Sequence, residues 1–211
     1  MRKWFRFVSY LFVSAWFSQA NAGAYEDFFK AVILDDAGTV SALMGRGFDP
    51  NSPDERGQVA LYLAMREPSP QVAAMLWARP DLKIDALNTV GETSLMMAAL
   101  RGNLDWVQRL LDRGAAINKE GWTPLHYAAS GPQPAVLSLL LDRGAQIDAL
   151  SPKGTTSLML AAQYGSEESV FLLLKRGANA NLRDPRGLGV VDFARLGGRE
   201  SLQARLSASA R

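Results

Sequence analysis

The feature that most constrains this chain is a segment of about 33 residues that recurs in register along most of its length. Each copy opens on a glycine, and successive glycines are 34, 30, 33 and 33 residues apart: Gly57, Gly91, Gly121, Gly154 and Gly187. An Arg-Gly pair forms a second column in the same register: Arg46-Gly47, Arg113-Gly114, Arg143-Gly144 and Arg176-Gly177. A period of this size is typical of repeat proteins, in which each unit buries its apolar face only by stacking on its neighbours.

Each unit is predicted to contain two helices. Threonines stand where the first helix needs an acceptor for its unpaired N–H groups: Thr93, Thr123 and Thr156. Pairs of alanines keep this helix thin, so neighbouring units can approach closely. The second helix carries one apolar stripe, as at Val107, Leu110 and Leu111, and a glycine such as Gly114 ends it.

The segment Thr123-Pro124-Leu125-His126-Tyr127-Ala128-Ala129 contains the motif T-P-L-H-x-A, and through its repetition the chain resembles the ankyrin-repeat family over about residues 24–206. The resemblance implies an all-α repeat solenoid, an ankyrin stack of helix–turn–helix units with short β-hairpin fingers. About five repeats and a C-terminal cap are expected: 24–56, 57–90, 91–120, 121–153, 154–186 and the cap 187–206. The first two repeats diverge most from the pattern, and the tail 207–211 is expected to fray.

The first 22 residues have the features of an export signal. In order, they contain a basic start at Arg2, Lys3 and Arg6, an apolar run from Phe7 to Phe17, and the cleavage-type tripeptide Ala20-Asn21-Ala22. Cleavage after Ala22 is predicted to leave the repeat domain 23–206; an uncleaved anchor and a buried first helix are the alternatives. The overall composition looks bacterial, so the expected location is the periplasm, with no membrane span in the mature chain.

The composition excludes several kinds of metal site and catalytic site. The chain has no cysteine and one histidine, His126, which excludes disulfides, thiolate metal sites, a cysteine nucleophile and any metal site with two histidines. The net charge of +2 belongs to the N-terminal segment, because without it the 23 basic residues fall to 20, against 21 acidic ones. The mature chain therefore gives no support to a nucleic-acid partner. With no phosphate-binding motif either, no catalytic residue, metal or cofactor is expected.

His126 is interpreted as a structural residue. The resemblance implies that it forms hydrogen bonds between adjacent loops, and a catalytic role is the alternative. Met96 and Met159 occupy the same column in the neighbouring repeats, so a catalytic histidine there would stand alone. The methionines are interpreted as packing residues rather than as metal ligands.

The predicted function therefore depends on surface residues that could contact a partner. Ankyrin stacks usually bind partners on their concave face, and the resemblance places eight residues there: Arg66, Glu92, Leu100, Arg101, Trp122, Thr155, Gln163 and Tyr164. Between Asn118 and Gly121 the chain has two residues where the following loops have five, which predicts a gap beside Trp122. Trp122 either anchors a partner side chain at this gap or packs down to fill it.

The function predicted from these patterns is that of a non-enzymatic, monomeric protein-binding module exported to the periplasm. A more specific alternative is an immunity or inhibitor protein that blocks a toxin or a secreted hydrolase. Scaffold and chaperone-like roles fit the same patterns. A hydrolytic enzyme with a site on the divergent N-terminal repeats is a third hypothesis, which lacks any recognisable catalytic group.

Overall fold

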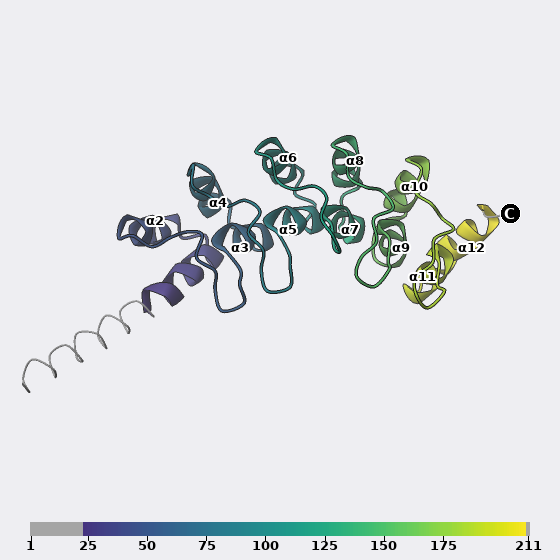
Figure 1. The fold of residues 1–211 in the computed structure, drawn as a ribbon, viewed down its shortest axis with the longest axis horizontal. Coiled ribbons are helices and arrows are strands. Elements are labelled where there is room, and N and C mark those ends of the chain that lie inside the picture. The colour runs from purple at the N-terminus through teal and green to yellow at the C-terminus, as the bar shows by residue number, and fades with distance from the viewer. Residues whose placement is uncertain (1–22, 210–211) are drawn as a thin grey trace, which may run out of the picture. The chain divides into compact units, whose positions relative to one another are not determined.

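The computed structural model describes residues 23–209, which form helices joined by loops (Figure 1). The predicted export signal, residues 1–22, lies outside the described residues. The chain divides into two compact units between Leu82 and Lys83. This boundary falls inside the predicted repeat 57–90, where Pro80 and Asp81 stand in place of the usual glycine after the second helix.

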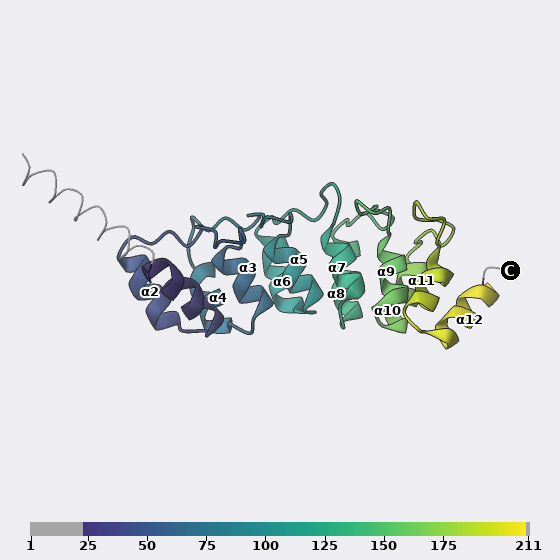
Figure 2. The same cartoon turned by 90° about the horizontal axis from the view of Figure 1, so that it is seen from below.

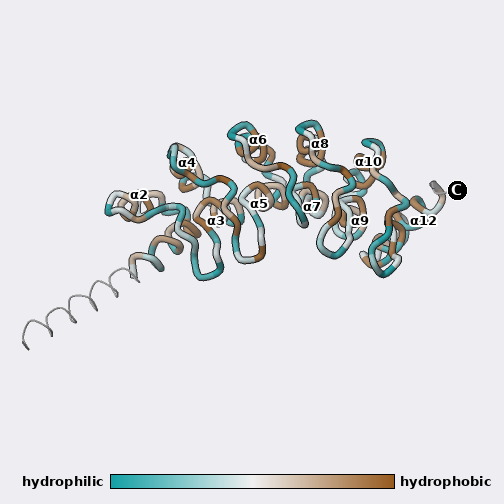
Figure 3. The backbone as a smooth tube through the Cα atoms, in the orientation of Figure 1, coloured by the Kyte–Doolittle hydropathy of each residue, from teal (hydrophilic) through white to brown (hydrophobic). Residues whose placement is uncertain are grey.

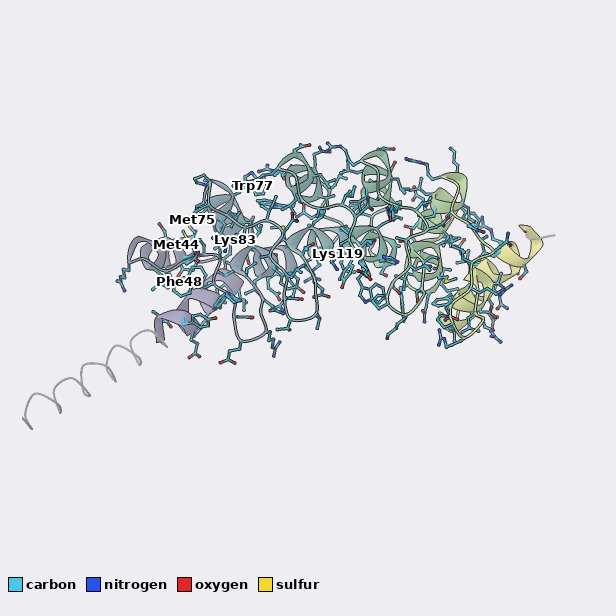
Figure 4. The ribbon with its side chains drawn as sticks, viewed as in Figure 1. Met44, Phe48, Met75, Trp77, Lys83 and Lys119 are labelled. Carbon is cyan, nitrogen blue, oxygen red and sulfur yellow. The ribbon has the colours of Figure 1, made fainter. Side chains whose placement is uncertain are left out.

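The first unit contains a helix over residues 23–33, then α2 (Ala37–Gly45), α3 (Ala60–Arg66) and α4 (Pro70–Trp77). Aromatic side chains pack its first repeat together: the ring of Phe48, labelled in Figure 4, stacks on that of Phe28 with the centroids 4.1 Å apart. Asp35 has a φ of 57° and accepts the Val72 N–H at 2.9 Å. This bond joins the turn of the first helix pair to the start of α4.

The second unit contains eight helices within the described range 83–209. They are α5 (Ser94–Leu100), α6 (Leu104–Asp112), α7 (Pro124–Ser130), α8 (Pro134–Asp142), α9 (Ser157–Gln163), α10 (Glu167–Lys175), α11 (Val190–Leu196) and α12 (Glu200–Ser209). The inner helices α5, α7, α9 and α11 lie side by side, and α6, α8 and α10 form an outer layer behind them (Figures 1 and 2). Hydrophobic residues gather where the two layers face each other (Figure 3).

The observed helix pairs confirm the predicted all-α repeat solenoid. A backbone bond closes each of these loops, such as Asn88 N–H to Glu92 O at 3.1 Å and Ser151 N–H to Thr155 O at 3.0 Å, and a second bond forms the turn inside it, such as Gly91 N–H to Asn88 O at 3.0 Å. Within residues 23–209 these fingers contain no β-strand, because the bonds of one tight turn do not make a ladder. Helix α12 continues beyond the buried Leu206 to Ser209, and residues 210 and 211 of the tail predicted to fray lie outside the described residues.

Small residues allow the inner helices to pack closely. Ala98, Ala128 and Ala161 are at most 1% exposed. At Gly165, which follows α9, an added Cβ would lie 2.2 Å from the carbonyl oxygen of Ala129 in α7. Any side chain at this position would force the two helices apart, so the glycine is required by the close approach of neighbouring repeats.

Side chains also link one repeat of the second unit to the next. Each acceptor at the end of one repeat receives a backbone N–H from the following one: Asp85 from Ala116 (3.1 Å), Asn118 from Gln146 (2.9 Å) and Asp148 from Asn179 (3.0 Å). These bonds satisfy loop N–H groups that would otherwise have no partner in the fold. They explain why the sequence repeats an Asp or Asn at this point of the period.

His126 links α7 to the following repeat, as the resemblance implied. Its Nδ1 accepts the Thr123 N–H at 3.1 Å, which places the ring proton on Nε2, and Nε2 donates to the Thr155 carbonyl at 3.0 Å. In α5 and α9 the equivalent residues are Met96 and Met159, whose N–H groups are capped by the threonine hydroxyls. The imidazole thus takes over a capping role at the start of α7 and adds a bond between repeats.

We expect amide hydrogen exchange to be faster in residues 24–90 than in 91–186. Val59 and Ser69 begin α3 and α4 without a side-chain cap, whereas Thr93 and Thr156 cap α5 and α9. A missing cap costs about 1 kcal/mol, and the weakest part of a repeat array opens first. Exchange followed by mass spectrometry on the full chain measures this, and equal protection of both regions would contradict it.

The stability of the protein is expected to fall on acidification below about pH 6.5. Burial lowers the pKa of His126 below its ordinary value of 6.5. The unfolded chain therefore takes up this proton at a higher pH than the native state does, and the free energy of unfolding decreases as the pH drops from 6.5 towards the native pKa. The slope reaches at most about 1.4 kcal/mol per pH unit.

Urea unfolding between pH 5.5 and 7.5 measures this dependence, using His126→Met as the matched variant. The same column accepts methionine at Met96 and Met159, both almost fully buried. The variant should be less stable at pH 7.5, because the bond to Thr155 is lost, and nearly insensitive to pH in this range. The same pH slope in both proteins would show that His126 is not the group responsible.

Candidate functional site

A pocket of about 240 Å³ lies on the inner helices of the second unit. The residues that line it are Leu100, Trp122, His126, Tyr127, Ser130, Leu160 and Tyr164. They come from α5, α7 and α9 and from the residues directly before α7 and after α9. The fold thus brings together three of the eight residues predicted to contact a partner: Leu100, Trp122 and Tyr164.

Trp122 forms one end of the pocket. The side chain is half-buried, and its ring lies edge-on to the rings of His126 and Tyr127, with centroids 5.4 Å and 6.3 Å apart. Edge-to-face contacts of this kind hold an aromatic ring in a defined orientation. Trp122 is therefore packed on one side and accessible on another, and both interpretations of its role are compatible with this position.

Glu92 holds the neighbouring wall in place. The Tyr127 hydroxyl donates to Glu92 Oε1 at 2.7 Å, and the Asn88 side-chain amide donates to Glu92 Oε2 at 2.7 Å. Both carboxylate oxygens are thus engaged within the protein. Glu92, which the sequence predicts as a partner contact, positions Tyr127 from the loop that precedes α5.

Small residues at the end of α7 contribute to the pocket. Ser130 stands in the column that Leu100 and Gln163 occupy in the neighbouring repeats. Gly131 follows it, and a Cβ at Gly131 would lie 2.8 Å from the Leu100 carbonyl oxygen. The space that longer side chains fill in the other repeats is therefore left open between Leu100 and Tyr164.

The short loop, residues 118–121, runs in a different direction from its neighbours. In Figure 1 the loops that lead into α5 and α9 extend below the helices and the loop into α7 does not, whereas in Figure 2 the loop into α7 rises above its helix. Lys119, labelled in Figure 4, donates from Nζ to the Trp122 carbonyl at 3.4 Å. This carbonyl corresponds to the backbone acceptors Glu92 O and Thr155 O of the neighbouring loops. The Lys119 ammonium is therefore fixed beside Trp122.

Two polar groups at the pocket are left without a protein partner. Among residues 23–209, no hydrogen bond engages the Trp122 indole N–H or the Tyr164 hydroxyl. Tyr164 is 65% exposed, and Trp122 is only half-buried. The pocket thus combines a largely apolar and aromatic lining with a free donor at one end and a hydroxyl at the other.

The remaining predicted contacts lie elsewhere. Thr155 is buried, and its carbonyl is bonded to His126, so its side chain is removed from the surface that a partner could reach. Arg101 and Gln163 neighbour lining residues in the sequence but do not line the pocket. Arg66 belongs to the first unit, where its guanidinium contacts Glu67 at 2.8 Å.

Tyr127, Ser130 and Leu160 line the pocket and were not predicted. Tyr127 and Leu160 occupy the variable position of the T-P-L-H-x-A motif, which points away from the buried Leu and Ala positions of the same short helix. The variable position of the motif was therefore the sequence signal that could have identified Tyr127 and Leu160. Ser130 contributes by its small size, which becomes meaningful only beside the larger Leu100 and Tyr164.

Two searches of residues 23–209 gave negative results. No group of three His, Asp or Glu side chains is arranged to hold a metal ion in this range. In the same part of the chain, every helix falls short of the length and apolar character needed to cross a membrane.

Known proteins are similar to this chain over its repeats. The family model "Ankyrin repeats (3 copies)" matches residues 28–120, 71–150 and 95–184. Protein phosphatase 1 regulatory subunit 27 of Mus musculus is 37% identical over 87 residues, which is 40% of this chain and 56% of that protein. The B-cell lymphoma 3 protein homolog of Mus musculus is 33% identical over 135 residues, 61% of this chain and 30% of that protein. The chain thus spans about half, or less, of the curated relatives it matches.

One solved structure covers more of the chain. It is that of the predatory endopeptidase Bd0816 from Bdellovibrio bacteriovorus in complex with immunity protein Bd3460, and one of its chains superposes with a TM-score of 0.73. The two sequences are 24% identical, and the match covers 86% of this chain and 97% of that chain. At this identity the likeness concerns the fold. The family match extends over most of the described residues and over the helix pairs stacked in register, so the chain belongs to the ankyrin-repeat family.

Proposed function

We propose that this protein is a non-enzymatic module that binds another protein through the pocket at Trp122. The observation that carries the proposal is the aromatic pocket itself, formed where the regular array is interrupted by the short loop and by Ser130. A tryptophan and a tyrosine that border such a pocket are the residue types that dominate interface energetics. The ankyrin family supports a binding role rather than catalysis by analogy of fold.

The polar groups of the site favour binding over catalysis. A hydrolase needs a nucleophile, a base and an orienting acid within reach of one another. The single imidazole has both ring nitrogens engaged by Thr123 and Thr155, and the nearest carboxylate, Glu92, has both oxygens engaged by Tyr127 and Asn88. Each group is committed to holding the pocket in shape.

An immunity or inhibitor role is the second candidate. It is favoured by one observation, the superposition with a chain from a complex between an endopeptidase and an immunity protein. In this role the Trp122 pocket would take a side chain of the hydrolase. An assay of hydrolase inhibition by this protein, with Trp122→Ala in parallel, separates this role from that of a scaffold.

We further propose that the protein is exported to the periplasm and acts there as a monomer. The support is the order of charge, apolar run and small residues in residues 1–22.

Trp122→Ala is expected to weaken partner binding by about 1–3 kcal/mol and to leave the melting temperature nearly unchanged. Partners are captured by crosslinking from periplasmic extract with the wild-type protein, and the affinity of each variant is then measured. Leu196→Ala is the matched control, because Leu196 is 52% exposed at the end of an inner helix but does not line the pocket. A large fall in melting temperature with unaltered affinity would show that Trp122 is a packing residue.

The mature protein is expected to begin at Gly23. Intact-mass measurement on the periplasmic fraction of an expressing bacterium tests this, because removal of residues 1–22 gives a defined loss of mass. Recovery of the full-length chain from the membrane fraction would support the anchor alternative instead.

A further inference from the structure

We propose that the Trp122 pocket receives an aromatic side chain from an extended segment of the partner, with an acidic residue next to it that faces Lys119. This inference rests on the proposed function and specifies the chemistry of the partner.

The size of the pocket fits a six-membered ring. Its volume is about 240 Å³, and a dry cavity of about 150 Å³ is enough to hold benzene. A phenyl or phenol side chain therefore fits with room for its Cβ and part of the main chain. Trp122, Tyr127 and Tyr164 offer ring edges and faces, which favour an aromatic guest over an aliphatic one of equal area.

The guest side chain should be uncharged. None of the lining residues is an Asp, Glu, Lys or Arg, burial lowers the pKa of His126 and so favours its neutral form, and both carboxylate oxygens of Glu92 are bonded by Tyr127 and Asn88. A charged group in the pocket would lose its hydration without gaining a counter-ion. The Trp122 indole N–H, unbonded within residues 23–209, can donate to a main-chain carbonyl, which favours a peptide segment over a plain hydrocarbon.

The charge beside the pocket fits an acidic neighbour. The Lys119 ammonium lies 3.4 Å from the Trp122 carbonyl and is held there by a second carbonyl, that of Glu120, at 3.1 Å. At the other end of the pocket, the exposed Arg101 follows Leu100. Glu120 is also exposed, so these three side chains together carry a net charge of +1. A carboxylate on the guest segment gains most beside Lys119, whose position is fixed.

Three blocked five-residue peptides test the inference on the full chain. The first carries an aspartate followed by a phenylalanine among glycines; the second replaces the phenylalanine by alanine, and the third replaces the aspartate by lysine. Binding is followed by the NMR signal of the Trp122 indole N–H, identified by its absence in Trp122→Phe. The first peptide should shift this signal saturably, with affinity about tenfold higher than the second and several-fold higher than the third. In about 1 M salt the preference over the third should fade.

Ser130→Leu should abolish peptide binding by filling the pocket, and Gln163→Leu is its matched control. Both positions belong to the column that holds leucine naturally at Leu100 and Leu196, so the fold accepts the change. Gln163 does not line the pocket, and Gln163→Leu should leave the affinity for the first peptide unchanged. Urea unfolding of both variants checks that the repeats are intact.

Several results would overturn the inference. Binding of the alanine peptide as tightly as the first peptide, or of the lysine peptide as tightly or more tightly, contradicts the inference. Unchanged binding of the first peptide to Ser130→Leu, or no NMR shift with any peptide at millimolar concentration, also contradicts it. If the peptides fail while capture of a partner protein still depends on Trp122, the proposed function stands and the chemistry of the guest is wrong. If capture is independent of Trp122, the proposed function itself fails.

Discussion

The architecture of the second unit depends on how closely its short inner helices approach one another. Seven-residue helices are too short to be stable alone, so their stability comes from packing. The approach is so close that a Cβ at Gly165 would reach 2.2 Å from a carbonyl oxygen of α7. Buried alanines, side-chain acceptors such as Asp148 and the His126 bridge all act at this contact. Repeat stacking therefore sets the position of every surface side chain on α5, α7 and α9.

The candidate site lies where the repeat around α7 differs from its neighbours at two places. The short loop before α7 brings Lys119 to the Trp122 carbonyl. At the other end of α7, Ser130 stands where neighbouring repeats carry Leu100 and Gln163. The pocket lies along the helix between these two places and is lined by aromatic residues.

Some polar groups near the pocket are bonded within the protein, and others are available to a partner. Glu92, Asn88 and His126 have their polar atoms engaged inside the protein, and they fix the orientation of Tyr127 and the start of α7. The Trp122 indole N–H and the Tyr164 hydroxyl have no such partner within the described residues. A rigid wall with few unsatisfied groups loses little conformational entropy on binding, which favours affinity from a small contact.

The repeat period, the helix pairs and the short loop could all be determined from the sequence, because stacking imposes the same local pattern on every repeat. The sequence also identified Trp122, Tyr164 and Leu100, whose columns face outward in the period. Only the tertiary structure decided that Glu92 positions Tyr127 and that Thr155 is buried. These outcomes depend on which side chains meet across adjacent repeats. The position of a residue within the repeat period shows which face of the helix it occupies, but not which residue of the next repeat it contacts. The pocket is the clearest case, because the small size of Ser130 has meaning only beside the larger residues that stacking brings to either side.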